Sequence, residues 1–112
     1  MLVGVAAILE VPDRRTGEPV RVTLIPVKVD ATWYVLGFGG VTGWVRNLRT
    51  AGRATLRRKG RTEAFMAMEV DGEERERAIA AYFARPAGPV RRDFDRLPES
   101  ADHPVFRLEP IG

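Results

Sequence analysis

The sequence has no cysteine, and its 112 residues include a single histidine, His103. Without cysteine the chain cannot build a disulfide framework, a thiolate metal site or a cysteine nucleophile. One histidine excludes a histidine-based triad and the metal sites that need several histidines from one chain. We therefore predict no metal site and assign no catalytic residue.

Long hydrophobic runs are also missing. The apolar run at residues 1–9 is ended by Glu10 and is too short to span a membrane. It lacks the basic segment that opens a secretory signal, so we expect a cytoplasmic protein without a membrane span. We interpret residues 2–11 as a strand with apolar side chains on both faces, as in a sheet covered on both sides. The length predicts one domain over residues 1–112.

Positive charge exceeds negative charge only slightly, with a formal net charge of +3, and nearly all the basic residues are arginine. The planar guanidinium group suits carboxylate and phosphate, so this balance fits an anionic ligand without requiring nucleic acid. The densest basic run would either meet phosphate or an acidic tail, or form a solvated strand face. It consists of Arg53, Arg57, Arg58, Lys59 and Arg61.

Strand patterns dominate the chain and follow one another through short turns. They predict a mainly β, α+β fold: a six-stranded, mostly antiparallel barrel with two or three short helices packed outside. Pro26 cannot donate to a ladder and therefore marks an edge or a bulge. The expected strands are residues 2–11, 20–29, 33–38, 53–59, 61–70 and 103–108, and the expected helices are 43–51, 71–85 and a stretch within 91–96.

The sequence also predicts the residues at which the helices begin and end. Thr42 is the expected N-cap of the first helix, and Gly52 is its expected left-handed C-terminal residue. Asp71 and Glu74 have the spacing of a capping box at the start of the second helix.

Residues 39–52 form a glycine-rich junction between a strand and a helix. Such a junction brings backbone N–H groups close to a ligand, and a helix N-terminus favours anions. Trp44 and Asn47 lie three apart on one helical face, where tryptophan can flank a planar ligand and asparagine can bond its edge. The alternative is a tight loop followed by a core tryptophan.

A second candidate is the turn Arg14-Arg15-Thr16-Gly17 between the first two strands. Two guanidinium groups, a hydroxyl and a glycine that exposes backbone can clamp an anion. The alternative is an ordinary solvated turn.

Taken in order, these segments resemble the deazaflavin-dependent nitroreductase family, whose members use coenzyme F420. That family has a Gly-Arg-(Arg/Lys)-(Ser/Thr)-Gly turn, matched here by residues 13–17, and a following proline-initiated basic strand, matched by residues 18–24. It then has Gly-Gly and a Trp-x-x-Asn-Leu helix, matched by residues 39–40 and 44–52. Residues 103–108 are similar to its closing strand.

The resemblance implies a split β-barrel like that of the pyridoxamine-phosphate oxidases. It implies an oxidoreductase that transfers a hydride from reduced coenzyme F420 to a small planar electrophile, an enone, quinone or nitroaromatic. The cofactor supplies the chemistry, which fits a chain with few conventional catalytic residues. The cofactor contacts it implies are Arg14, Arg15, Thr16, Gly17, Arg21, Thr23, Leu24, Phe38, Gly39, Gly40, Gly43, Trp44, Val45 and Asn47.

One residue departs from the family motif. Asp13 stands where the family has glycine, so a carboxylate either lies near the phosphate site or forms a salt bridge or cap within the turn. Two other functions stay open: a split barrel that binds flavin mononucleotide or a related planar ligand, and a non-enzymatic ligand-binding or dimerisation module. We expect a homodimer with a small-molecule substrate and no nucleic-acid partner.

Overall fold

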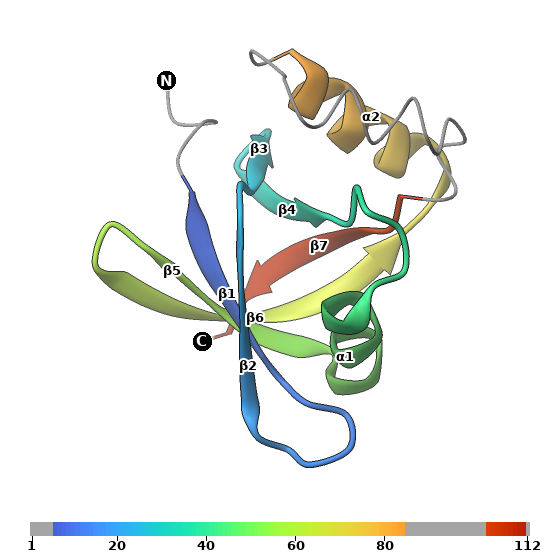
Figure 1. Cartoon of the computed structure of the whole chain (residues 1–112). Helices are drawn as coiled ribbons and strands as arrows, with labels where there is room; N and C mark the ends of the chain where they lie inside the picture. Colours follow the sequence, from blue (N-terminus) through green and yellow to red (C-terminus); the bar gives the residue numbers. More distant parts are fainter. Residues whose placement is uncertain (1–5, 85–102, 112) are drawn as a thin grey trace.

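One antiparallel sheet of seven strands curls into a half-open barrel (Figure 1). The computed structural model describes residues 6–84 and 103–111. Along the sheet the strands follow the order β2-β1-β5-β6-β7-β4-β3. The elements are β1 (Ala7–Pro12), β2 (Pro19–Leu24), β3 (Val27–Val29), β4 (Thr32–Leu36), α1 (Gly43–Ala51), β5 (Arg53–Arg58), β6 (Arg61–Val70), α2 (Gly72–Phe83) and β7 (Val105–Pro110).

The mainly β, antiparallel barrel predicted from the sequence is confirmed, but with seven strands in place of six. The expected strand over residues 20–29 breaks after Leu24, because Pro26 has no N–H to continue the ladder. Its first part, β2, pairs with β1, and its second part, β3, pairs with β4 at the other edge of the sheet. The helix expected within residues 91–96 lies outside the described residues.

The first helix begins and ends where the sequence predicts. Gly52 has a φ of 68°, and its N–H donates to the carbonyl of Leu48 at 2.8 Å. Thr42 occupies the N-cap position, yet its side chain forms no capping hydrogen bond. The predicted capping box at α2 is wrong. Asp71 is at the N-cap, but its side chain forms no capping hydrogen bond, and the Glu74 carboxylate accepts hydrogen bonds from Tyr34 and Arg107 instead.

Two apolar clusters fill the molecule. One lies inside the barrel, where α1 inserts Val45 and Leu48 against the inward side chains of β1, β5, β6 and β7. The other lies between α2 and the far end of the sheet, where Tyr82 packs on Phe38 with ring centroids 4.5 Å apart. In Figure 1, α2 covers β3 and β4 while α1 stands beside the lower end of the sheet. The two helices therefore close different parts of the barrel.

The first strand is buried on one face only. Leu9 and Val11 are buried, whereas Ile8 between them is 37% exposed. The expectation of a strand covered on both sides is therefore wrong for residues 7–11, because neither α1 nor α2 covers the outer face there (Figure 1). Residues 2–5 of that expected strand lie outside the described residues. In the described part of the chain, neither helix has the length and apolar character needed to cross a membrane.

Candidate functional site

The β1–β2 turn is fastened to helix α1 through one side chain. The Oδ1 atom of Asn47 accepts a hydrogen bond from the backbone N–H of Arg14 at 3.0 Å and another from its Nη1 atom at 2.8 Å. Asn47 lies in the middle of α1 and is only 3% exposed, so these bonds are partly shielded from water. The structure thus brings together the two segments that the sequence singled out separately.

Within the same turn, the Asp13 carboxylate binds the backbone. Its Oδ2 atom accepts hydrogen bonds from the N–H groups of Arg15 at 2.9 Å and Thr16 at 3.0 Å, and from the Thr16 hydroxyl at 3.3 Å. The backbone donors of Thr16 and then Arg15 hold the pKa of the Asp13 carboxyl below its usual range. Of the two roles left open for Asp13, the structure shows the cap within the turn.

The glycine-rich loop between β4 and α1 makes a close backbone approach. A Cβ on Gly37 would lie 3.0 Å from Cγ2 of Val45 and 3.2 Å from the carbonyl oxygen of Gly40. Gly40 itself has a φ of 90°, a conformation that other residues rarely adopt. Gly37 was not singled out from the sequence, although it is the first glycine of the Gly37-x-Gly-Gly run. Because of this packing, the N-terminus of α1 lies directly against the strand end.

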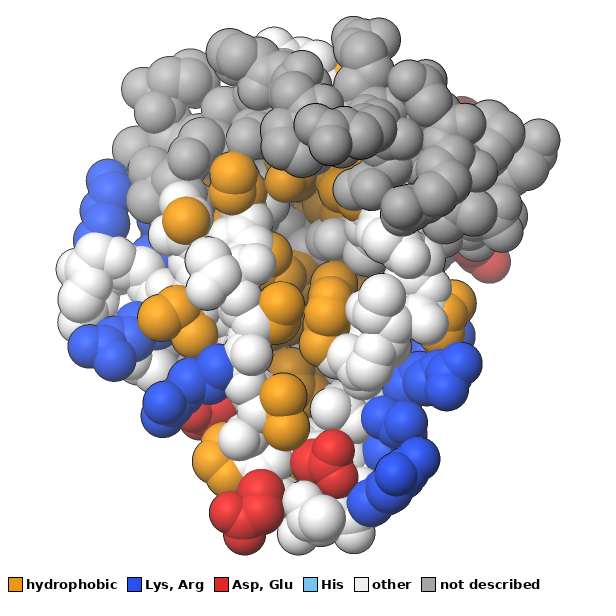
Figure 2. Space-filling view, viewed as in Figure 1, with side chains coloured by type: hydrophobic (Ala, Val, Ile, Leu, Met, Phe, Trp, Pro, Cys, Tyr) orange, Lys and Arg blue, Asp and Glu red, His pale blue; other side chains and the backbone are white. Residues whose placement is uncertain are grey.

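Helix α1 presents its first turn without a side-chain cap, and its positive dipole end is available to a negatively charged group. Trp44, at this end, is half-buried and packs on Phe106 with ring centroids 6.3 Å apart. Figure 2 shows hydrophobic side chains along the hollowed middle of the face between β2 and α1, with lysine and arginine on both flanks. Val22 and Leu24 of β2 and Trp44 of α1 are partly buried residues that pack against the barrel core.

The other predicted cofactor residues divide by exposure. Phe38 and Val45 are 8% and 0% exposed, so their side chains belong to the core and a ligand would meet their backbone. Arg21 and Thr23 alternate with Val22 along β2 and point to the outer face of the sheet, where Arg21 pairs with Glu10 at 2.9 Å. Leu24 lies on the inner face with Val22.

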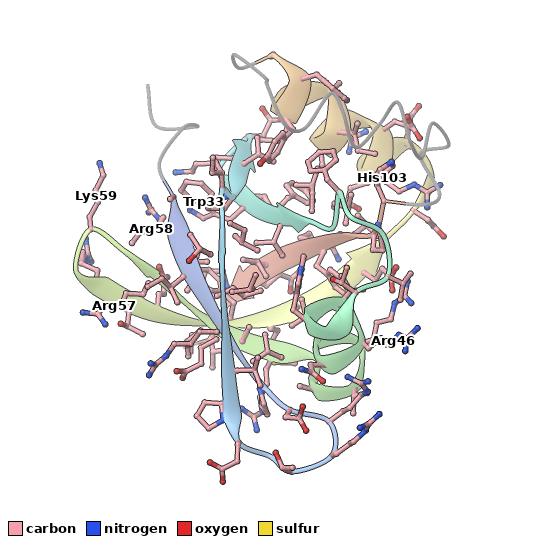
Figure 3. The ribbon with its side chains drawn as sticks, viewed as in Figure 1. Trp33, Arg46, Arg57, Arg58, Lys59 and His103 are labelled. Carbon is pink, nitrogen blue, oxygen red and sulfur yellow. The ribbon has the colours of Figure 1, made fainter. Side chains whose placement is uncertain are left out.

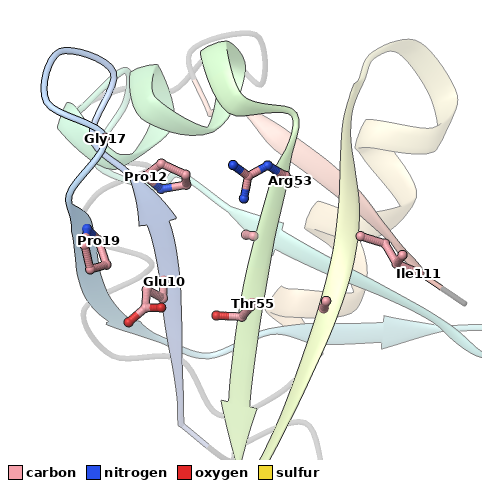
Figure 4. Close-up of a pocket in the computed structure, with 9 residues that line it drawn as sticks. Glu10, Pro12, Gly17, Pro19, Arg53, Thr55 and Ile111 are labelled. Atoms are coloured by element: carbon pink, nitrogen blue, oxygen red, sulfur yellow. The ribbon is translucent and has the colours of Figure 1, made fainter.

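A concavity of about 400 Å³ opens on the outer face beside the turn (Figure 4). Gly17 and Pro19 form its end near the turn, and Arg53 and Thr55 of β5 form another side. Its lining is mixed in charge, because Glu10 faces Arg53 across it. Of the predicted cofactor residues, it contains Gly17.

His103 lies away from this turn, beside Phe38 of the second core cluster. It is fully buried, and its ring centroid is 5.6 Å from that of Phe38. In residues 6–84 and 103–111, no group of three histidine, cysteine or carboxylate side chains is placed to hold a metal ion.

The described donors fit a flat, anionic ligand. Partly exposed apolar side chains can cover a ring system, the uncapped helix end and the glycine backbone offer N–H donors, and the arginine turn supplies positive charge. One detail opposes the fit: Asp13 already occupies two of the turn's N–H groups.

A family model of F420H2-dependent quinone reductases matches residues 2–92, a span that includes both the arginine turn and the Trp44 helix. The chain belongs to the F420H2-dependent quinone reductase family. The resemblance inferred from the sequence motifs is thereby confirmed. A comparison with curated proteins finds no match.

Solved structures share the fold of this reductase-family chain. A protein of unknown function from Agrobacterium tumefaciens is 23% identical with a TM-score of 0.74, over 96% of this chain and 49% of its own length. The chain thus spans about half of that protein. A structure described as an F420H2-dependent reductase is 22% identical with a TM-score of 0.66, and the match covers 93% of each chain. A domain-swapped dimer has the same identity and TM-score, over 93% of this chain and 79% of its own. Identities this low show the fold alone.

Proposed function

We propose that this chain is an oxidoreductase that uses reduced coenzyme F420 to transfer a hydride to a small planar electrophile such as a quinone, enone or nitroaromatic. The observation that carries the proposal is the family match over residues 2–92. The Arg14–Asn47 contact supports it, because it brings the anion-binding turn against the helix that would flank the ring.

The chain's own groups have distinct roles in this proposal. Arg14 and Arg15 attract the phosphate and acidic tail of the cofactor, and Thr16 offers a hydroxyl. The backbone of Gly39 and Gly40 and the first turn of α1 donate hydrogen bonds to the polar edge of the ring.

Apolar surface completes the proposed site. Trp44 and Leu24 cover the ring and exclude water from one side. When bound, the reduced deazaflavin supplies the hydride, so the protein needs only to orient the ring and the electrophile.

The direct test is a titration of the purified protein with oxidised coenzyme F420, followed by the fluorescence of the deazaflavin. We expect saturable binding, and reduction of a benzoquinone when the reduced cofactor is supplied. The Arg15→Ala variant should bind more weakly, because Arg15 is exposed and its side chain forms no hydrogen bond or ion pair with the described residues. Arg77→Ala, an exposed position on α2, is the control for loss of one positive charge. Absence of binding at high micromolar cofactor would contradict the proposal.

We also propose that the chain forms a homodimer through the outer face of the sheet. Met66 and Met68 on β6 are 48% and 45% exposed, and Ile8 and Ile111 add further exposed apolar surface. A domain-swapped dimer among the similar structures supports dimerisation. Sedimentation velocity should show a dimer that dissociates in a Met66→Glu, Met68→Glu variant, and a monomer of the unmodified chain at working concentration would refute it.

A further inference from the structure

At the end of the barrel away from the arginine turn, an arginine stacks on a tryptophan. The guanidinium carbon of Arg58, the last residue of β5, lies 4.4 Å from the ring centroid of Trp33 on β4. The ammonium of Lys28 lies 5.4 Å from the same centroid. Figure 3 shows Arg58 extending from the β5–β6 hairpin toward Trp33. The strand order places β4 and β5 apart in the sheet, so this contact crosses the mouth of the barrel.

The contact with Trp33 holds the Arg58 guanidinium over the ring but leaves its N–H donors unused. The in-plane N–H groups of Arg58 form no hydrogen bond or ion pair with any residue of the described ranges 6–84 and 103–111. A guanidinium held on an aromatic face loses little further rotamer freedom when it binds a carboxylate or phosphate. Arg58 is therefore a pre-organised receptor for an anion.

Arg58 lines a concavity of about 470 Å³, which lies within the size range of small-ligand sites. The inward side chains of Leu56 and Phe65 form its apolar floor. One carboxylate, Glu63, stands against three cations, and in the described part of the chain none of these cations has an ion-pair partner. The residues that line it are Leu56, Arg58, Lys59, Arg61, Thr62, Glu63 and Phe65.

This concavity is separate from the candidate cofactor site. Ile8, at the start of β1, is the partner of Arg57 in the sheet, whereas Arg14 follows Pro12 at the opposite end of β1. Pro12 is four positions further along β1 than Ile8, about 13 Å at the usual rise. The two groups of arginines would therefore need separate ligands or two distant parts of one ligand.

We propose that the Arg58 concavity is a second binding site, for a small, multiply charged anion that carries phosphate or carboxylate groups. The bounded, apolar-floored concavity favours a small ligand over a nucleic-acid strand. The two neighbouring arginines of the hairpin lie on opposite faces of the sheet: Arg57 lines a concavity on the outer face with Ile8 and Thr23, whereas Lys59 at the hairpin tip borders both concavities. A continuous basic stripe, as a nucleic-acid backbone would need, is therefore not formed by this pair.

The test measures binding of pyrophosphate and of citrate to the full chain by titration calorimetry. We expect at least one of them to bind saturably, and Arg58→Gln to weaken that binding by about tenfold. Arg58→Lys keeps the charge but loses the planar fork, and should weaken it by a smaller factor. The matched control is Arg57→Gln, which removes the same charge from the adjacent residue and should change affinity by less than about twofold.

Three results would overturn the proposal. These are the absence of saturable binding by both anions at millimolar concentration, an equal loss in the Arg57→Gln and Arg58→Gln variants, and binding of a single-stranded oligonucleotide in place of the small anions. Circular dichroism should show that the variants remain folded. If Arg58→Gln does not fold, Arg58→Lys against Arg57→Lys still compares the two faces.

Discussion

Arg14 and Asn47 are 33 positions apart in the sequence, yet the Asn47 Oδ1 atom accepts both the backbone N–H and the Nη1 donor of Arg14. A single amide oxygen thus joins the tip of the first hairpin to the only helix that enters the barrel core in the described structure. The orientation of the turn relative to Trp44 depends on this contact.

Asn47→Ala should loosen the hairpin tip. The variant loses two hydrogen bonds, one of them from a charged donor, and we expect the free energy of unfolding to fall by about 1–3 kcal/mol. Urea denaturation measures this change. Arg46→Ala is the control, because Arg46 is exposed on the same helix and its side chain has no bonding partner among the described residues (Figure 3). Equal stability of the two variants would show that the contact does not anchor the turn.

Asp13 should limit the affinity for an anionic cofactor. Its carboxylate occupies the N–H groups of Arg15 and Thr16, and these bonds lower its pKa, so it stays ionised through neutral pH. Asp13→Gly releases both donors and removes a negative charge, so coenzyme F420 should bind several-fold more tightly. The deazaflavin fragment without phosphate is the control ligand, and its affinity should not change. An equal gain in affinity for both ligands would show that Asp13 does not act through the phosphate.

Acid should weaken the attachment of α2. The Tyr34 hydroxyl donates to the Glu74 carboxylate at 2.7 Å, and Arg107 donates to it at 2.8 and 2.9 Å. The Tyr34 bond and then the Arg107 bonds lower the pKa of Glu74 below its ordinary value of 4.5. A lowered carboxyl pKa stabilises the fold above the ordinary value, and this contribution is lost as the pH falls through the folded-state value.

Thermal unfolding between pH 7 and pH 3 tests this relationship. The unmodified chain should lose stability below about pH 4.5. Glu74→Gln should be less stable at neutral pH by about 1–3 kcal/mol, and its stability should fall less steeply as the pH is lowered. Glu73→Gln, an exposed position on the same helix turn, should keep the full acid dependence. If the stability of Glu74→Gln falls with pH as steeply as that of the unmodified chain, other carboxylates cause the loss of stability in acid.

The junction before α1 should tolerate a methyl group at one glycine and not at another. In Gly37→Ala the new Cβ would press on Val45 at 3.0 Å and on the Gly40 carbonyl at 3.2 Å, and we expect a loss of about 1–3 kcal/mol. In Gly39→Ala the nearest atom is Cγ2 of Thr42 at 3.7 Å, an ordinary contact. Chemical denaturation of the two variants gives the comparison, and similar stabilities would mean that the loop relaxes freely.

Local patterns in the sequence were sufficient for most elements. The glycine at position 52 ends α1 because it adopts the left-handed conformation that other residues avoid, and β6 coincides with the expected strand over residues 61–70. The arginine turn and the Trp44 helix were identifiable as a pair because the order of short motifs resembles a family, not because their residues indicated contact. Pro26 marked an interruption, but which strand pairs with the chain after it depended on the sheet order.

What the sequence by itself determined was the set of elements, the absence of cysteine-based and multi-histidine chemistry, and the two segments able to meet an anion. These follow from properties of consecutive residues: periodicity, backbone freedom and side-chain charge. Only the tertiary structure decided that Asn47 binds Arg14, that Asp13 occupies the turn's own donors, that Phe38 lies beneath α2, and that Arg58 stacks on Trp33. Each of these depends on which strands become neighbours or on how one turn closes, and such contacts are set by the packing of the whole sheet rather than by the local sequence.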